Sequence, residues 1–286
     1  MHNKSFCILG PIAVLTLSLL GPAPVHASAI LPGTLPNTLA KGDDVSSSAV
    51  ALGFGASGIN LFGQTYTSVY INTNGNVTFG GPLNNFVVNG LADGVGVPIF
   101  APFFADVDTT SAGTVSYGNL TVNGRTAFVV DWTGVGYYSR GTDKTNTFQL
   151  ALFNRADTGA GNFDLEFNYG QIQWETGNAN GGTNGLGGIS AAVGYSDGKN
   201  LYSELAGSFE NGALLDGGSR ALIANTLGTS GVAGRYDFQV RSGQVSVAAP
   251  VPEPATLLLL IPGALALFLL GRCRRPRNQE ENSSAL

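Results

Sequence analysis

Between residues 30 and 250 the chain repeatedly alternates apolar and polar side chains with a period of two, and this pattern constrains the fold more than any other feature of the sequence. In residues 163–169 every second side chain is an apolar one, and the side chains between them are charged or amide groups. Residues 235–241 repeat the alternation. Such alternation is typical of antiparallel strands that bury one face. No part of this segment shows the 3.6-residue period of an amphipathic helix, so the sequence predicts an all-β domain.

Glycine-containing turn signals separate the expected strands. Asn74-Gly75 and Asn123-Gly124 each suit a two-residue hairpin turn of type I′. After Gly170 the apolar positions shift by one residue, which indicates a β-bulge. Further strands are expected at residues 65–71, 76–80, 101–107, 113–117, 125–132, 145–153, 189–195 and 203–209. About ten short strands separated by turns predict an antiparallel β-sandwich with a jelly-roll-like arrangement.

The cysteines and histidines of the chain all lie near its ends, at His2, Cys7, His26 and Cys273. The central segment of residues 30–250 therefore offers no disulfide, no Ser-His-Asp triad, no cysteine nucleophile and no His/Cys zinc site. The same segment carries 9 Lys and Arg against 16 Asp and Glu, a formal charge of −7. Because phosphate binding requires a basic surface, nucleic acid is not an expected partner.

The first 29 residues have the layout of a secretory signal peptide. Lys4 precedes an apolar stretch over residues 6–20, and the small residues Ala27 and Ala29 supply two candidate cleavage positions. The alternative is an N-terminal membrane anchor. That alternative is disfavoured because the apolar stretch is short and contains Gly10-Pro11. We therefore expect the protein to be exported.

A second apolar run, over residues 255–270, lies near the C-terminus. As a helix its 16 residues would be about 24 Å long, which is short for a hydrocarbon core of about 30 Å. The run is preceded by Val251, Pro252, Glu253 and Pro254 and followed by Arg272, Arg274, Arg275 and Arg277. The arginines would hold the C-terminus in the cytoplasm.

This combination of Pro-Glu-Pro, apolar helix and arginine cluster resembles the PEP-CTERM sorting signal of bacteria that build an exopolysaccharide matrix. The resemblance implies one transmembrane helix within residues 251–277, transient anchoring in the inner membrane and recognition by exosortase, a membrane cysteine protease. It also implies release or transfer of the protein at the cell surface. Residues 278–286, expected to be a cytoplasmic tail, depart from the family, whose members usually end soon after the arginines. A plain single-pass anchor is the alternative.

Two groups of motifs in the central segment carry a second resemblance. The first group is IFAPFFADVD at 99–108 with GTVSY at 113–117. The second group is DWTGVGYY at 131–138, DKTNTFQL at 143–150, FNYGQIQW at 167–174 and TGNANGGTNGLGG at 176–188. In this order and spacing they resemble the nidogen-like (NIDO) extracellular domain, with Phe104 where the family often has Trp. The expected organisation is an N-terminal β portion at 30–98, the nidogen-like domain at 99–241 and a linker at 242–250.

In animals this domain occurs in basement-membrane and other extracellular proteins. The resemblance implies a module of matrix proteins associated with cell–matrix adhesion, and it implies no catalytic residues. We therefore expect a non-enzymatic protein of the cell surface or biofilm matrix. Its expected partners besides exosortase are exopolysaccharide or another matrix protein. Analogy at the level of the fold does not identify the ligand.

Asp106 and Asp108 are the strongest candidates for metal ligands in the sequence. They lie two residues apart, so both carboxylates are expected on one face of a strand, with the hydroxyls of Thr109 and Thr110 nearby. Oxygen donors of this kind suit Ca²⁺. The alternative is a strand end whose Asp side chains cap the following turn. Because no known calcium-loop spacing accompanies the pair, turn capping is favoured and calcium is the second hypothesis; no other cofactor is expected.

Aromatic side chains are the candidates for sugar binding, because they can stack on sugar rings. Trp132 and Trp174 continue the apolar faces of their strands and are expected in the core. The predicted ligand surface instead consists of Tyr137, Tyr138, Asp143 and Lys144. The Gly/Asn-rich loop at 176–188, either a functional loop or a packing-driven Ω-loop, is expected beside it. This surface predicts the second hypothesis for function, a lectin-like carbohydrate-binding module.

A glycoside hydrolase is the third hypothesis, because two carboxylates suffice for that chemistry. Asp131, Glu166 and Glu175 are the carboxylates that could pair. Glu166 lies on the polar face of its expected strand, where a solvated charge is the ordinary state. The hydrolase hypothesis is therefore weaker than the two binding hypotheses.

Overall fold

The computed structural model describes residues 28–86, 90–91 and 95–248. The predicted signal peptide, apart from its last two residues, lies outside the described residues, as do the predicted sorting signal and its transmembrane helix. Within the described ranges, no helix is both long and apolar enough to cross a membrane. The described part of the chain is all β, and its helical structure is confined to two 3₁₀ turns, η1 (Ala156–Thr158) and η2 (Asn178–Asn180).

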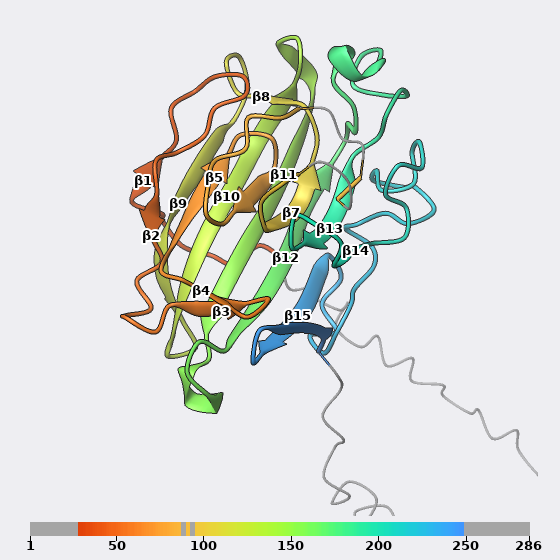
Figure 1. Cartoon of the computed structure of the whole chain (residues 1–286). Helices are drawn as coiled ribbons and strands as arrows, with labels where there is room; N and C mark the ends of the chain where they lie inside the picture. The colour runs from red at the N-terminus through yellow and green to blue at the C-terminus, as the bar shows by residue number, and fades with distance from the viewer. Residues whose placement is uncertain (1–27, 87–89, 92–94, 249–286) are drawn as a thin grey trace, which may run out of the picture.

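Two antiparallel sheets pack as a β-sandwich (Figure 1). The larger sheet has the order β1 (Asn37–Thr38), β9 (Thr114–Val122), β10 (Arg125–Tyr137), β11 (Gly141–Asn154), β12 (Phe163–Ile172), β15 (Arg235–Arg241) and β16 (Gln244–Val247), with β8 (Val107–Asp108) paired to β10. The smaller sheet has the order β14 (Tyr202–Glu204), β13 (Ala192–Ser196), β7 (Ile99–Phe104), β6 (Asn76–Thr78), β5 (Ser68–Asn72) and β2 (Val50–Ala51). A separate hairpin is formed by β3 (Ile59–Leu61) and β4 (Gln64–Tyr66).

The strand order corrects the jelly-roll-like arrangement that the sequence predicted, although the antiparallel sandwich itself is confirmed. In the larger sheet β9, β10, β11 and β12 are neighbours in the order in which they occur along the chain. They form a meander, whereas a jelly roll requires Greek-key connections. The physical reason is the length of the connections, because turns of two and three residues at 123–124 and 138–140 can join only adjacent antiparallel strands.

Aromatic side chains fill the core between the two sheets. Phe100 and Phe103 of β7 face Phe163 and Phe148 of the larger sheet, with ring centroids 6.0 and 5.4 Å apart. These contacts join segments that are distant in the sequence. The side chains buried at this interface belong to one continuous cluster that draws on both sheets.

Both tryptophans are fully buried, as the strand pattern predicted. Trp132 stacks on Phe148 at 5.1 Å, and its Nε1 donates hydrogen bonds to the carbonyl oxygens of Asn72 and Thr73 at 3.2 and 3.0 Å. Trp174 donates from Nε1 to the carbonyl oxygen of Val135 at 2.9 Å. Each indole therefore satisfies its polar atom while its ring packs in the core.

The hairpin turns agree with the sequence at one site and differ at the other. Asn123 and Gly124 have φ angles of 49° and 77° and join β9 to β10 as a two-residue turn, which confirms that prediction. Between β5 and β6 the register pairs Asn72 with Asn76 and leaves three residues in the turn. Of these only Gly75 has a positive φ, 69°. The type I′ turn predicted at Asn74-Gly75 is therefore wrong, because a three-residue loop needs the left-handed conformation only at its last residue.

The predicted bulge after Gly170 is present. Phe148 of β11 pairs with Tyr169, and the preceding residue Thr147 pairs with Gln171, so Gly170 is the extra residue. The bulge returns Ile172 to the buried face. The one-residue shift of the apolar positions after Gly170 thus results from the bulge in the strand.

An N-terminal segment, residues 29–47, covers part of the larger sheet from outside before it reaches one end of the sandwich. The backbone of Leu31 exchanges two hydrogen bonds with the side chain of Gln149, at 3.0 and 3.2 Å. Arg235 donates to the carbonyl oxygen of Ala29 at 2.9 Å. Leu31 also packs in a small apolar cluster on this outer face with Ala127, Val129, Ala151 and Phe153. The segment is therefore an integral part of the fold.

Near the C-terminal end of the described residues, the larger sheet continues as β16 (Gln244–Val247) into the segment 242–250 that is expected to form a linker. Ser242 and Gly243, with φ angles of 50° and 80°, close a two-residue turn after Arg241. The chain then returns as β16 along β15. The correction follows from this turn, because two consecutive residues with positive φ favour a tight hairpin.

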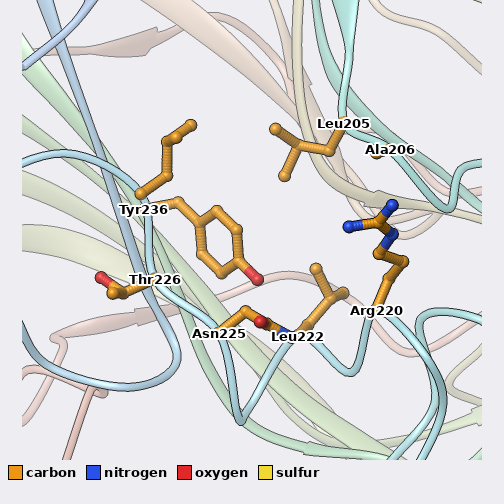
Figure 2. A pocket seen from close by; sticks show the side chains of 8 residues that line it. Leu205, Ala206, Arg220, Leu222, Asn225, Thr226 and Tyr236 are labelled. Atoms are coloured by element: carbon orange, nitrogen blue, oxygen red, sulfur yellow. The ribbon is translucent and has the colours of Figure 1, made fainter.

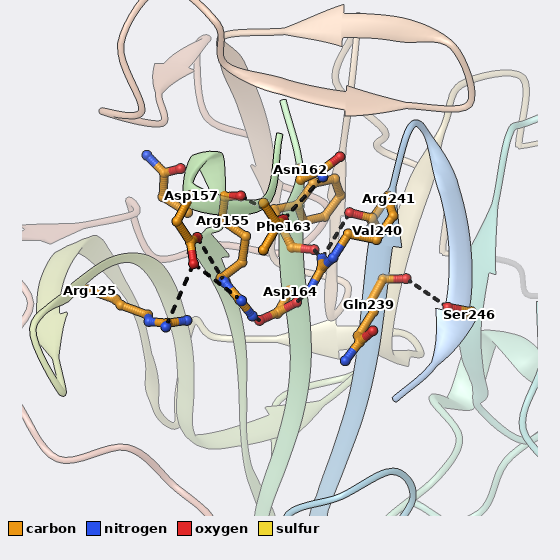
Figure 3. Close-up of polar contacts among 12 residues, drawn as sticks. Arg125, Arg155, Asp157, Asn162, Phe163, Asp164, Gln239, Val240, Arg241 and Ser246 are labelled. Carbon is orange, nitrogen blue, oxygen red and sulfur yellow. Dashed lines mark hydrogen bonds and ion pairs between the residues drawn. The ribbon is translucent and has the colours of Figure 1, made fainter. Parts of the chain in front are cut away.

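A network of arginines and carboxylates ties the connection between β11 and β12 to β15 (Figure 3). Asp164 accepts from Arg155 at 2.6 Å and from Arg241 at 2.5 Å. Arg155 also pairs with Asp157 at 3.0 Å, and Arg125 approaches the same carboxylate at 3.8 Å. Every member of this network pairs with an opposite charge, and its contacts join three strands and a turn, so we interpret it as a structural feature.

Candidate functional site

Three carboxylates line a small cavity at the end of the sandwich where β7 gives way to β8. Asp43, Asp44 and Asp106 each direct a carboxylate oxygen to a common point, and these oxygens lie within 4.8 Å of one another. The cavity has a volume of about 120 Å³, and Phe86, Tyr138 and Ala179 complete its wall. Such a volume holds a few water molecules or a hydrated ion.

The N-terminal segment delivers Asp43 and Asp44 to this point. The N–H of Gly42, which precedes them, donates to the hydroxyl of Thr109 at 2.9 Å, and the carbonyl oxygen of Gly42 accepts from the backbone N–H of Thr109 at 3.0 Å. Val45, which follows them, exchanges hydrogen bonds with Thr73 in the β5–β6 turn. Asp44 has a positive φ of 53°, a conformation that Asp tolerates better than most residues. The two carboxylates are therefore held by anchors on both sides.

Asp106 reaches the cavity from the turn between β7 and β8. Its residue is 1% exposed, and its Oδ2 atom has no hydrogen-bond partner among the described residues. The backbone of Gly177 lies so close that a Cβ atom there would be 2.3 Å from Oδ2. Oδ1 of Asp43 is likewise buried without a partner, whereas Asp44 accepts a hydrogen bond from Asn74 at 2.6 Å.

The cluster concentrates negative charge in a desolvated place. Burial, together with the repulsion of the neighbouring carboxylates, raises the pKa of Asp106 to about 7 and that of Asp43 to about 6. Burial also raises the pKa of Asp44, while the hydrogen bond from Asn74 acts in the opposite direction. None of the ion pairs formed within the described residues involves these three groups.

The structure separates Asp108 from Asp106, its predicted partner in a metal site. Oδ1 of Asp108 accepts hydrogen bonds from the backbone and hydroxyl of Thr110, and Oδ2 accepts one from the backbone of Arg140 at 3.0 Å. Asp108 thus caps the turn after β8, which was the favoured reading. Asp106 therefore meets Asp43 and Asp44 at the cavity, and Asp108 is not part of this group, although its charge still contributes to the raised pKa of Asp106.

Of the residues predicted to form the ligand surface, only some are exposed to solvent. Tyr137 is 4% exposed, and its ring packs on Trp174 at 5.7 Å, so its prediction as a surface residue is wrong. Adjacent residues of a strand face opposite sides, and here Tyr137 takes the core side while Tyr138 is half-buried at the cavity. Tyr137 donates from its hydroxyl to Asp143 at 2.5 Å, and Asp143 also pairs with Lys144 at 2.6 Å.

The Gly/Asn-rich loop at 176–188 lies beside these residues, as expected. The backbone of Asn178 donates to the carbonyl oxygen of Tyr138 at 2.9 Å. Gly185 leaves no room for a Cβ between Trp174 and Tyr137, and Gly177 leaves none beside Asp106. The loop therefore closes one side of the acidic cavity and covers the end of the core at the same time.

The three carboxylates considered for hydrolysis have separate environments. Glu166 forms an ion pair with Arg235 at 3.6 Å, while Glu175 accepts two hydrogen bonds from the backbone of Gly212 at 2.8 and 2.9 Å. Asp131 has one oxygen without a partner among the described residues, and burial raises its pKa to about 6. None of these three carboxylates lines the acidic cavity described above.

A second hollow, of about 260 Å³, lies elsewhere on the molecule (Figure 2). The ring of Tyr236 and the guanidinium of Arg220 border it from different sides, with Leu205 and Leu222 between them. Asn225 and Thr226 add polar atoms. Because Tyr236 is only 6% exposed, the polar atoms of Arg220, Asn225 and Thr226 are the groups that could contact a small polar ligand such as a sugar.

The sequence did not predict that Asp43 and Asp44 line the acidic cavity, and it did not predict the lining of the second hollow. For Asp43 and Asp44 the available signal was their adjacency after Gly42. That signal was incomplete, because more than 60 residues separate the pair from Asp106 and the contact depends on the path of the N-terminal segment.

Comparison with known proteins gives a family and several relatives. The model of the nidogen-like domain matches residues 67–242, so the match begins well before residue 99, where the recognisable motifs start. Alpha-tectorin of Mus musculus and of Homo sapiens are each 31% identical over 234 aligned residues, which cover 73% of this chain and 10% of theirs. Nidogen of Drosophila melanogaster is 27% identical over 236 residues, covering 73% of this chain and 16% of its own.

The chain thus spans about a tenth of the length of the alpha-tectorins it matches. No solved structure matches it significantly.

Proposed function

The chain belongs to the nidogen-like domain family, and on that premise we propose that it is an exported, non-enzymatic component of a bacterial extracellular matrix that acts in adhesion or in matrix structure. The observation that carries the proposal is the match of the family over residues 67–242, which includes most of the β-sandwich. The relatives are named alpha-tectorin and nidogen, and the domain that they share resembles a module of extracellular matrix proteins. Because these relatives belong to the same family, they support a matrix or adhesion role for this chain, and they do not identify its ligand.

The sorting route is part of the proposal. The sequence Val-Pro-Glu-Pro at 251–254, the apolar run and the four arginines support cleavage by exosortase after transient anchoring in the inner membrane. Two prolines keep the peptide extended, which is the conformation that proteases bind. The cleaved protein would then be retained at the surface or in the matrix.

Cell fractionation of the producing bacterium tests this route. The wild-type protein should occur in the surface or matrix fraction without its C-terminal residues, and the double variant Pro252→Ala/Pro254→Ala should accumulate as an uncleaved precursor in the inner membrane. Ser283→Ala, which changes the tail beyond the arginines, is the matched control. Mass spectrometry that finds Arg277 still attached to the surface protein would contradict cleavage.

Co-sedimentation with the insoluble exopolysaccharide of the same bacterium tests the matrix role. Saturable binding of the purified protein would support contacts with polysaccharide. Absence of binding, with self-association or capture of a defined surface protein, would direct the role to protein partners. Release of sugar from the same material would contradict the non-enzymatic assignment and revive the hydrolase hypothesis.

A lectin-like module is the second candidate function, and the hollow bordered by Tyr236 and Arg220 is the observation that favours it. This location replaces the tyrosine pair of the sequence hypothesis, because Tyr137 is 4% exposed; Tyr236 is also buried, at 6% exposed, so the polar groups of Arg220, Asn225 and Thr226 would hold the sugar. Saturable binding of one oligosaccharide that is lost in Arg220→Ala and kept in Arg125→Ala would support the lectin. Equal binding by both variants would remove this hollow as the site.

A further inference from the structure

We propose that Asp43, Asp44 and Asp106 form a binding site for Ca²⁺ that fastens the N-terminal segment to the end of the sandwich. This inference goes beyond the matrix role and is independent of the route by which the protein is exported. It concerns the cavity between the N-terminal segment, the β7–β8 turn and the Gly/Asn-rich loop.

Unsatisfied oxygens are the first argument. An acidic cluster at a surface needs no ion, because water solvates its charges. Here Asp106 lines the cavity and is 1% exposed, and its Oδ2 has no hydrogen-bond partner among the described residues. Oδ1 of Asp43 shares this condition at the same point. Buried polar atoms are nearly always paired, so two buried carboxylate oxygens without protein partners favour a cation as their partner.

The donor set identifies the class of cation. All three side chains offer hard oxygen atoms, which suit Ca²⁺ and Mg²⁺ and are poor ligands for soft metals. Calcium accepts six to eight oxygens at 2.3–2.6 Å with irregular geometry. The carboxylates now lie within 4.8 Å of one another in a cavity of about 120 Å³, so water molecules can fill the remaining positions. Magnesium demands a stricter octahedron, and a cluster contributed by two separate segments does not favour it.

The three carboxylates come from two segments of the chain, so an ion bound to them would connect these segments. Asp43 and Asp44 precede residue 67, where the family match begins, whereas Asp106 lies within it. A bound ion would therefore link the segment that lies outside the family match to the part of the sandwich inside it. Because ligand binding to the folded state stabilises that state, the ion should raise the melting temperature of the domain.

The test is calcium titration of the full chain, purified in mild detergent and stripped with EDTA. Isothermal titration calorimetry with CaCl₂ should give one site per chain, with a Kd on the order of 10⁻⁴ M, in the range of extracellular calcium modules. The melting temperature should rise by about 5 °C in 10 mM CaCl₂. Terbium luminescence sensitised by Tyr138, which lines the cavity, should appear and be quenched by added calcium.

Three variants make the result decisive. Asp106→Asn and Asp43→Asn/Asp44→Asn should each lose the calcium-dependent rise, whereas Glu210→Gln, which alters an exposed carboxylate, should keep it. Asp106→Asn should melt at or above the temperature of the stripped wild type, because it removes repulsion, and this shows that the variant folds. No heat and no change in melting temperature for the wild type would overturn the proposal. Binding retained in Asp106→Asn would overturn it as well, and an equal response to MgCl₂ would overturn the assignment to calcium.

Discussion

Single residues hold the two sheets together through polar atoms as well as through apolar packing. The hydroxyl of Tyr169, a residue of the larger sheet that is 2% exposed, donates to the carbonyl oxygen of Pro102 in β7 at 2.7 Å. Trp132 makes the corresponding link from β10 to the end of β5. These bonds fix the position of one sheet over the other, since apolar contacts alone have little directional preference.

Replacing Tyr169 by Phe tests one of these links. The ring is kept while the carbonyl of Pro102 loses its donor, so the free energy of unfolding should fall by about 1–2 kcal/mol. Tyr202→Phe is the matched control, because Tyr202 is 49% exposed and its change should cost less than about 0.5 kcal/mol. Urea denaturation measures both. Equal costs for the two variants would contradict the role given to the buried hydroxyl.

Glu166 makes stability depend on pH. Burial raises its pKa from 4.5 to about 7, and the repulsion of Asp237 and Asp164 adds to this, although Arg235 and Asn168 act in the opposite direction. Because the pKa is higher in the folded than in the unfolded state, the contribution of Glu166 to stability is complete below about pH 4.5 and is lost as the pH rises through about 7.

The corresponding variant is Glu166→Gln. Between pH 4.5 and pH 8 the wild type should lose up to about 3 kcal/mol of unfolding free energy relative to Glu166→Gln. Denaturant titrations at several pH values give this difference in unfolding free energy. Glu210→Gln is the control, because it shows how much the loss of an exposed carboxylate changes the pH dependence. A wild type that gains stability over this pH range relative to Glu166→Gln is incompatible with the assigned direction.

At the residue scale, the sequence was informative about burial and less so about sites. The alternation placed both tryptophans in the core because each continued an apolar face. Tyr137 and Tyr138 were ambiguous, because alternation requires one of them to face the core and does not say which one. The bulges and register shifts of β10 around Val135 decide this, and they arise from pairing with β11.

At the scale of elements, the hairpin turns differ in how well they tolerate a side chain in place of their glycine. Gly124 has a φ of 77° and open space around its Cα, whereas a Cβ on Gly75 would lie 1.8 Å from the carbonyl oxygen of Phe103. The first turn is constrained only by its backbone conformation. The second is constrained by conformation and by the close approach of β7.

Alanine at the two glycines separates these constraints. Gly124→Ala should cost about 1 kcal/mol of unfolding free energy, the ordinary penalty for a left-handed alanine. Gly75→Ala should cost at least about 3 kcal/mol or prevent folding, because β7 must move to admit the methyl group. Thermal melting of both variants provides the comparison. Similar melting temperatures would show that the β5–β6 turn has room that the structure does not display.

Elements were predictable from the sequence where the signal was local. Strand alternation, the turn at 123–124 and the bulge at Gly170 all depend on neighbouring residues, and the structure has them. The three-residue turn at 73–75 and the hairpin that forms β16 depend on register between strands. Register results from the packing of one complete strand on another, and a short motif does not contain it.

On the scale of the whole molecule, the N-terminal segment connects features that the sequence keeps apart. It crosses the outer face of the larger sheet, adds β1 to its edge and supplies two carboxylates at the end of the sandwich. Its path was not predictable, because it has few periodic apolar residues and several of its contacts span more than 60 residues of sequence. The order of the strands and the acidic cavity were hidden for the same reason.

The contacts of Ala29 bear on the two candidate cleavage positions of the predicted signal peptide. Ala29 is 4% exposed, and its carbonyl oxygen accepts a hydrogen bond from Arg235. Cleavage after Ala27 keeps this contact, whereas cleavage after Ala29 removes it. N-terminal sequencing of the exported protein should therefore begin at Ser28, and a sequence that begins at Ile30 would contradict the prediction.

The outer strands of both sheets are short. The edges of the larger sheet are β1 and β16, of two and four residues, and those of the smaller sheet are β14 and β2, of three and two residues. An exposed strand edge is a template for aggregation, and short edges offer few backbone groups to a neighbouring copy. A domain built in this way can be packed at high concentration and still remain a separate folded particle, without growing into amyloid-like fibres.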